Sequence, residues 1–230
     1  MTAITTRNYS PDHAEELIRG RRAVRSFRPD PVPDATMRAV FSLASAAPSN
    51  SNTQPWSVEV VSGAARDRLS EALLAAHAQQ RLSVDFPYRD DLYDEVHQRR
   101  RKDFGEAMYG ALGIGREDRE ARDAYNAESL RFYGAPHVAL VFAPSNADER
   151  MAADVGMYGQ TLLLAMTAYG IASCPQGLLG FYGDAIRESL EIRGGKVLFG
   201  VSFGYALESA PVNRIAVGRA ELGETTRFRA

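Results

Sequence analysis

The chain has 230 residues, enough for one large domain, and its 45% hydrophobic content is typical of a protein with a sizeable buried core. The net charge of −2 excludes a strong overall field for nucleic acid or for a membrane surface. No run approaches the ~18 consecutive apolar residues of a membrane-spanning helix, and the single cysteine excludes an internal disulfide. Because residues 1–10 also lack the apolar stretch of a signal peptide, we expect a cytoplasmic protein.

Helical and strand patterns follow one another irregularly. A short amphipathic run at 11–20 comes first, and Asp34 is then a plausible N-cap for a helix to about residue 47. The later patterns predict a strand at 56–61, a helix at 65–79, a strand at 135–143, a helix at 149–169 and a strand at 197–205. Because regular βαβ alternation is missing, we predict an α+β fold.

The helix at 149–169 is apolar on nearly all sides, so we expect it to be buried, with Gly170 just beyond its end. Residues 81–131 differ in texture, being charged, rich in tyrosine and weakly periodic. We interpret them as a helical lid within a single domain spanning 1–230. The basic run Arg99 to Lys102 lies among acidic residues and is expected to be a solvated helix face.

Several common catalytic chemistries are disfavoured. Gly200-Val201-Ser202-Phe203-Gly204 matches the nucleophile elbow of serine hydrolases, but no histidine follows it, so its glycines more simply allow close packing of a strand. No phosphate-binding glycine loop is present, and four scattered histidines with one cysteine predict no metal site. Cys174 has no neighbouring histidine or lysine and is interpreted as a buried thiol.

Three segments carry the polar groups of a possible site. The basic segment at 21–28 suits either a solvated face or phosphate capture by guanidinium groups. The loop at 48–55 suits either a Ser/Asn turn or amide recognition of a planar heterocycle. We interpret residues 174–177 as a third loop.

Together these segments resemble the FMN-dependent nitroreductase family. The resemblance rests on Arg21-Arg22-Ala23-Val24-Arg25-Ser26-Phe27, Pro31-Val32-Pro33, Ala47 through Trp56, the helix with Asp154, Gly156 and Gln160, Gly170 through Gly177, Gly204-Tyr205-Ala206, Pro211-Val212-Asn213-Arg214 and Arg219. It runs from about residue 14 to 228. Residues 109–114 look like the subgroup that includes the nitrobenzoate reductases.

The resemblance implies a central, mostly antiparallel sheet flanked by helices, in an intertwined homodimer that holds two FMN. The implied cofactor-binding residues are Arg21, Arg22, Ala23, Arg25, Pro48, Ser49, Asn50, Asn52, Gln54, Pro175, Gln176, Gly177, Arg214 and Arg219. Those at 48–54 would come from the partner subunit. Ala23 and Gln176 depart from the serine and glutamate frequent at these positions. Phe104 and Tyr109 would line the acceptor pocket or only pack the lid.

The implied reaction is ping-pong reduction of a nitroaromatic, a quinone or a similar small acceptor by NADH or NADPH. The flavin N5 would carry the hydride, so no protein group is an obligatory catalyst. Arg25 would stabilise the reduced flavin at its N1/O2 end. Two alternatives stay open: another reaction on the same cofactor, such as dehalogenation, enone reduction or substrate oxidation, and a flavin-sequestering protein without turnover.

Overall fold

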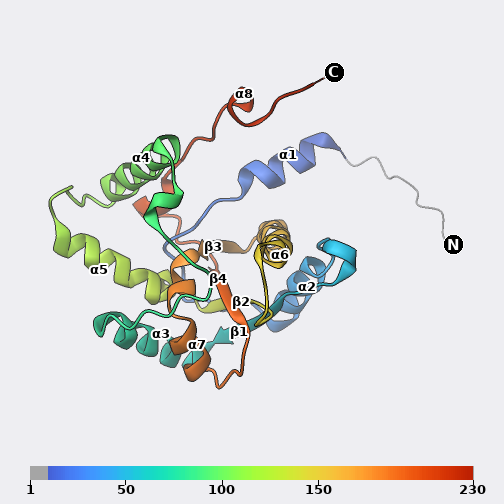
Figure 1. The fold of residues 1–230 in the computed structure, drawn as a ribbon. Coiled ribbons are helices and arrows are strands. Elements are labelled where there is room, and N and C mark those ends of the chain that lie inside the picture. The colour runs from blue at the N-terminus through green and yellow to red at the C-terminus, as the bar shows by residue number, and fades with distance from the viewer. Residues whose placement is uncertain (1–9, 230) are drawn as a thin grey trace.

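The computed structural model describes residues 10–229, which are built around one sheet (Figure 1). Its strands are β1 (Ser57–Ser62), β2 (His137–Ala143), β3 (Ala172–Gln176) and β4 (Lys196–Gly204). The spatial order is β1-β2-β4-β3, and each neighbouring pair is antiparallel. The expected α+β class is therefore confirmed, and β1 and β3 are the edge strands.

Helices cover both faces of the sheet. They are α1 (Pro11–Gly20), α2 (Asp34–Ala44), α3 (Gly63–Ala78), α4 (Glu95–Ala111), α5 (Arg119–Leu130), α6 (Glu149–Ala168), α7 (Gly183–Ser189) and α8 (Leu222–Thr225). α2 and α6 pack together on one face, and α3 and α7 on the other. Within residues 10–229, no helix has both the length and the apolar character needed to cross a bilayer.

Strand β2 divides the interior into two cores. Val138, Leu140 and Phe142 face the α3 and α7 side, whereas Ala139 and Val141 face the α2 and α6 side. Alternate side chains of a strand point to opposite faces, so a strand buried on both faces is apolar at every position. This explains why β2 was predictable from composition.

Two details of the predicted helices were wrong. Asp34 does not cap α2: it is the first helical residue, and its carboxylate accepts a hydrogen bond from Arg38 Nε at 2.7 Å. α6 is not buried on all sides, since Met157 remains 39% exposed. The predicted end of α6 is confirmed, because Gly170 takes the left-handed φ of 70° that glycine adopts without steric cost.

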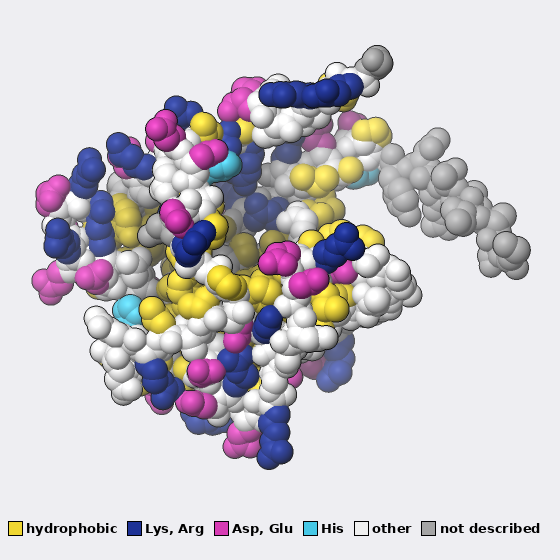
Figure 2. All heavy atoms as spheres, viewed as in Figure 1, with side chains coloured by type: hydrophobic (Ala, Val, Ile, Leu, Met, Phe, Trp, Pro, Cys, Tyr) yellow, Lys and Arg dark blue, Asp and Glu magenta, His cyan; other side chains and the backbone are white. Residues whose placement is uncertain are grey.

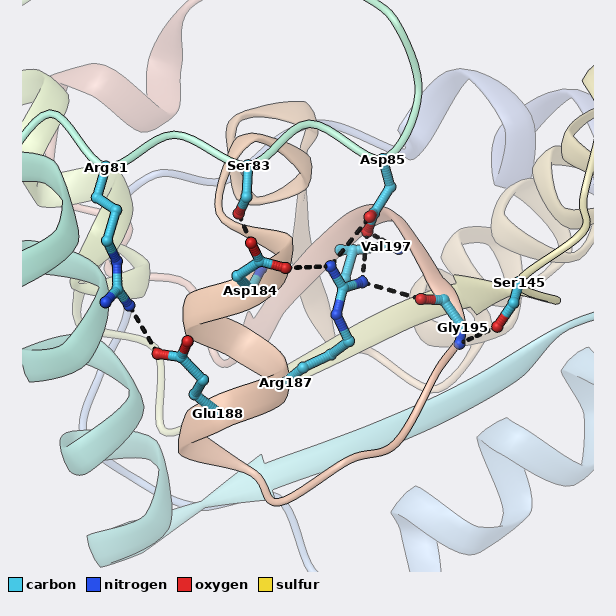
Figure 3. Close-up of polar contacts among 9 residues, drawn as sticks. All are labelled: Arg81, Ser83, Asp85, Ser145, Asp184, Arg187, Glu188, Gly195 and Val197. Carbon is cyan, nitrogen blue, oxygen red and sulfur yellow. Dashed lines mark hydrogen bonds and ion pairs between the residues drawn. The ribbon is translucent and has the colours of Figure 1, made fainter.

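The 81–131 segment contains α4 and α5 joined by loops, as helices and loops were expected there, and a charged cluster anchors its start (Figure 3). Arg187 of α7 makes a bidentate ion pair with Asp85, at 2.7 and 3.0 Å. Arg187 also donates to the Gly195 carbonyl, and the Val197 backbone N–H donates to Asp85. Both charged side chains are largely buried, so this cluster ties the segment to α7 and β4.

His137, at the start of β2, is held as a neutral ring. It is 3% exposed, and its Nε2 accepts a hydrogen bond from the Val32 backbone N–H at 2.9 Å. Because Nε2 is an acceptor, the proton of the neutral ring lies on Nδ1, which donates to the Ser62 hydroxyl. Burial lowers the pKa of His137 below its usual value.

This arrangement predicts acid sensitivity. The folded-state pKa of His137 lies below the unfolded value of about 6.5, so its stabilising effect is complete above that pH and is lost as the pH falls through the folded value. We expect the free energy of unfolding, measured in urea, to fall more steeply below pH 6.5 in the natural protein than in His137→Gln. His97→Gln, at an exposed site, should keep the natural slope. Equal slopes in all three proteins would contradict this assignment.

Candidate functional site

The basic segment lies along the free edge of β3. The Val24 backbone N–H donates to the Ser173 carbonyl at 2.9 Å, and Ala23 forms a parallel bridge with Ser173. Further along, the Arg28 backbone N–H donates to the Tyr205 carbonyl. The segment is therefore an extended ribbon whose backbone is tied to the sheet, and its side chains are presented from a rigid support.

Arg21 and Arg25 are half-buried, whereas Arg22 is exposed. Among residues 10–229, none of the three makes an ion pair with a carboxylate. Arg25 lies over the Phe104 ring at 5.1 Å, and its charge opposes the rise that burial causes in the pKa of Tyr133. A half-buried guanidinium without an acidic neighbour keeps donors free, which favours an anionic ligand.

The pKa of the Cys174 thiol, in β3, is affected by the charges of Arg21 and Arg25. The thiol is buried, and burial raises its pKa to about 11, while Arg25 and Arg21 act in the opposite direction. The two guanidinium groups thus lie close enough to β3 to influence the thiol. The expected buried thiol is confirmed, and it is protonated at neutral pH.

Residues 172–176 form a strand, so the interpretation of 174–177 as a loop was wrong. Pairing with β4, far along the chain, makes this strand despite Pro175. The Gln176 side chain points into the core, where its Nε2 donates to the Ser129 carbonyl at 2.6 Å and its Oε1 accepts from the Ser202 hydroxyl. Pro175 and Gly177 are exposed, so the backbone of this strand end is accessible, whereas the glutamine amide is not.

The loop at 48–55 is strained and bonded to itself. Ser51, Asn52 and Gln54 all have positive φ, which is uncommon outside glycine and is concentrated at functional sites. The Ser49 hydroxyl accepts from the Gln54 backbone N–H, and the Gln54 amide donates to Asn52.

An acidic residue of α6 holds this loop. The carboxylate of Asp154, which is 6% exposed, accepts both contacts of the Asn50 backbone N–H, at 3.1 and 3.2 Å. In Figure 1 the loop lies at the outer end of α2, well away from the basic segment beside β3. One chain therefore does not bring these two predicted parts of the site together.

The C-terminal part of the chain clamps the basic segment. Asn213 accepts a hydrogen bond from the Arg25 backbone N–H at 2.7 Å, and its amide donates to the Ser26 and Leu207 carbonyls. Arg214 and Arg219 are exposed, and Arg219 donates to the Val217 and Gly218 carbonyls. Sequence reasoning matched Asn213 to a motif without assigning this role.

Phe104 and Tyr109, both on α4, have different surroundings. Phe104 lies beneath Arg25, whereas the guanidinium of Arg122 lies over the Tyr109 ring at 4.5 Å. Tyr109 also lines a cavity between α4 and α5. Phe104 is thus placed beside the basic segment, and Tyr109 belongs to a second concave region.

Tyrosines missed by sequence reasoning connect the two regions. The ring of Tyr125 contacts those of Tyr109 and Tyr133, with centroids 6.3 and 6.1 Å apart. Within residues 10–229, the Tyr125 hydroxyl is the one buried side-chain oxygen or nitrogen without a hydrogen-bond partner, and burial raises its pKa to about 12. Phe132 and Tyr133 have consecutive positive φ values, a strain that the sequence does not signal.

The hydrolase and metal alternatives find no support. Ser202 is fully buried and donates to Gln176, so it is not an available nucleophile. A Cβ at Gly200 would lie 2.3 Å from Leu179 Cδ1, which confirms that this glycine permits close packing. Residues 10–229 contain no group of three or more His, Cys, Asp or Glu side chains able to hold a metal ion.

Comparison with known proteins assigns the family. The model of the Nitroreductase family matches residues 18–205. Nitroreductase NfnB of Mycolicibacterium smegmatis is 64% identical over 215 residues, covering 94% of this chain and 92% of that protein. A 4-nitrobenzoate reductase of Pseudomonas putida is 33% identical, covering 94% of this chain and 96% of its own length.

A solved structure agrees with these matches. The crystal structure of the FMN-dependent nitroreductase NfnB from Mycobacterium smegmatis, in complex with NADPH, superimposes with a TM-score of 0.93 at 62% identity, covering 95% of this chain and 99% of that one. The fold is therefore shared with that protein, and this chain belongs to the nitroreductase family.

Proposed function

We propose that the protein is an FMN-dependent oxidoreductase that uses NADPH or NADH to reduce nitroaromatic, quinone or similar small organic acceptors. The observation that carries this proposal is the pair of half-buried arginines, Arg21 and Arg25, which lack an acidic neighbour and lie beside the exposed backbone at the end of β3. The names of relatives support it, since NfnB of M. smegmatis is an FMN-dependent nitroreductase solved with NADPH.

The residues present fit FMN chemically. A phosphate dianion would satisfy the free donors of Arg21 and Arg22, with Arg214 or Arg219 as a further exposed cation. Arg25, whose backbone is held by Asn213, would balance negative charge at the pyrimidine end of the flavin. Ala23 offers no hydroxyl, so the phosphate relies on the arginines. When bound, FMN supplies hydride transfer between the nicotinamide and the acceptor.

We also propose that the protein is a homodimer, in which a second copy supplies the remaining part of the flavin site. Ile18, Leu43 and Met157 expose 57%, 47% and 39% of their surface on α1, α2 and α6, a set of apolar side chains that a second copy would cover. The loop at 48–55 would then reach the flavin of the partner, with Pro48, Ser49, Asn50, Asn52 and Gln54 contributing polar groups. We place this activity in the cytoplasm, where a buried free thiol such as that of Cys174 is usual.

Anaerobic reduction tests the proposal. The purified protein is expected to be yellow and to lose its flavin absorbance when NADPH or NADH is mixed in a stopped-flow instrument, and a nitroaromatic or quinone acceptor should restore it. A colourless protein that takes up no added FMN would contradict the flavin assignment. A yellow protein that neither nicotinamide bleaches would instead support the flavin-sequestering alternative. Bleaching without reoxidation by nitroaromatics or quinones would support another reaction on the same cofactor.

A further inference from the structure

A cavity between α4 and α5 is distinct from the basic segment. It has a volume of about 370 Å³, within the range of small-molecule sites, and its lining includes Tyr109, Arg116 and Arg122. Figure 2 shows basic side chains, interspersed with acidic ones, over this end of the molecule, where α4 and α5 lie in Figure 1. The helices thus enclose a concave space with an aromatic wall and a charged rim.

The charge of the rim favours an anion. Lys102, Arg116 and Arg122 line the cavity, against the single acid Glu106, which lies 3.8 Å from the Lys102 amine. Among the residues that the structure describes, Arg116 forms no ion pair. Guanidinium groups are well suited to phosphate, because their donors match two phosphate oxygens at once.

Two glycines of α4 line the cavity, one within the helix and one in its last turn. Gly105 and Gly110 line the cavity, and a Cβ at either position would meet nothing within 4 Å. Glycine weakens the interior of a helix relative to alanine, so helix propensity does not account for Gly105. Both glycines keep open a space that larger side chains would fill.

A row of aromatic rings leads from the cavity to the basic segment. Tyr109 contacts Tyr125, Tyr125 contacts Tyr133, and Tyr133 lies near enough to Arg25 for that charge to act on its pKa. These packed rings therefore connect the cavity to the neighbourhood of Arg25.

We propose that the α4–α5 cavity binds a phosphorylated adenosine, with the adenine beside the stacked Arg122 and Tyr109 side chains and the phosphate at Arg116 and Lys102. Two sources share this chemistry: the adenosine 2′-phosphate end of the electron donor NADPH, and a free nucleotide that acts as an effector. The first source rests on the proposed function, whereas the second does not.

The test uses the purified full-length protein and adenosine 2′,5′-bisphosphate as the probe. We expect calorimetry to show binding that weakens at least fivefold in Arg116→Gln and is abolished in Gly110→Leu, which fills the cavity. Arg99→Gln, an exposed charge on α4 outside the cavity, is the matched control and should bind normally. Leucine favours a helix more than glycine does, so Gly110→Leu should fold, as checked by circular dichroism and the thermal midpoint.

Kinetics separate the two sources. If the donor fills the cavity, Arg116→Gln should raise KM for NADPH severalfold with little change in KM for NADH or in kcat, and the bisphosphate should compete with NADPH. If a free nucleotide fills it, binding should depend on the cavity while KM for NADPH stays unchanged. The proposal is overturned if the bisphosphate does not bind, or binds Gly110→Leu as tightly as the natural protein. If neither nicotinamide bleaches the flavin of the natural protein, the proposed function is overturned, but the binding of a nucleotide in the cavity is not.

Discussion

Replacing Arg21 with alanine is expected to weaken FMN binding by about 10- to 100-fold, which corresponds to about 1.5–3 kcal/mol for a lost hydrogen bond to a charged group. Arg21 is half-buried, has no carboxylate neighbour among residues 10–229, and extends from a ribbon that is fixed to β3. Its guanidinium is thus positioned in advance for a phosphate. Fluorescence titration of the flavin-free protein with FMN measures the change.

Arg28→Ala is the matched control for this experiment. It removes the same charge from the same segment, but Arg28 is exposed and already paired with Asp30 at 2.9 Å. Exposed pairs of this kind contribute little to binding or stability, so FMN affinity should stay within about twofold of the natural value. Equal FMN affinities in Arg21→Ala and the natural protein would remove Arg21 from the phosphate site.

Replacing Arg187 with methionine is expected to lower the free energy of unfolding by about 2–4 kcal/mol, because it leaves the largely buried carboxylate of Asp85 without its cation. The Gly195 carbonyl loses a donor in the same variant (Figure 3). The damage should be concentrated at the start of the 81–131 segment. Urea unfolding measures the stability, and limited proteolysis maps the segment that opens.

Arg81→Gln provides the comparison. Arg81 pairs with Glu188 close to the same cluster, but both side chains are more than half exposed, at 52% and 63%. Its removal should cost less than about 0.5 kcal/mol. If the two variants were equally stable, the buried pair would not be the anchor of this segment. Faster cleavage within 81–131 only in Arg187→Met would support that role.

Local sequence patterns predicted those elements whose structure depends on nearby residues or on burial of both faces. β2 is apolar from Val138 to Ala143 because both of its faces are covered, and Gly170 marks the end of α6 because the backbone there needs a left-handed conformation. α7 lacked such a signal, and β3 contains a proline. β3 is a strand because β4 pairs with it, and pairing between segments far apart in sequence is not visible in either segment alone.

For the candidate site too, some features could be predicted from the sequence and others only from the tertiary structure. The sequence by itself determined the family, the kinds of side chain available and their order, because charge, hydrogen-bonding capacity and motif spacing are properties of the chain. Only the tertiary structure decided that the Gln176 amide is used in the core, that Asn213 clamps Arg25, and that the loop at 48–55 lies away from the basic segment. The direction of a side chain depends on which distant groups satisfy its hydrogen bonds, and folding brings those groups together.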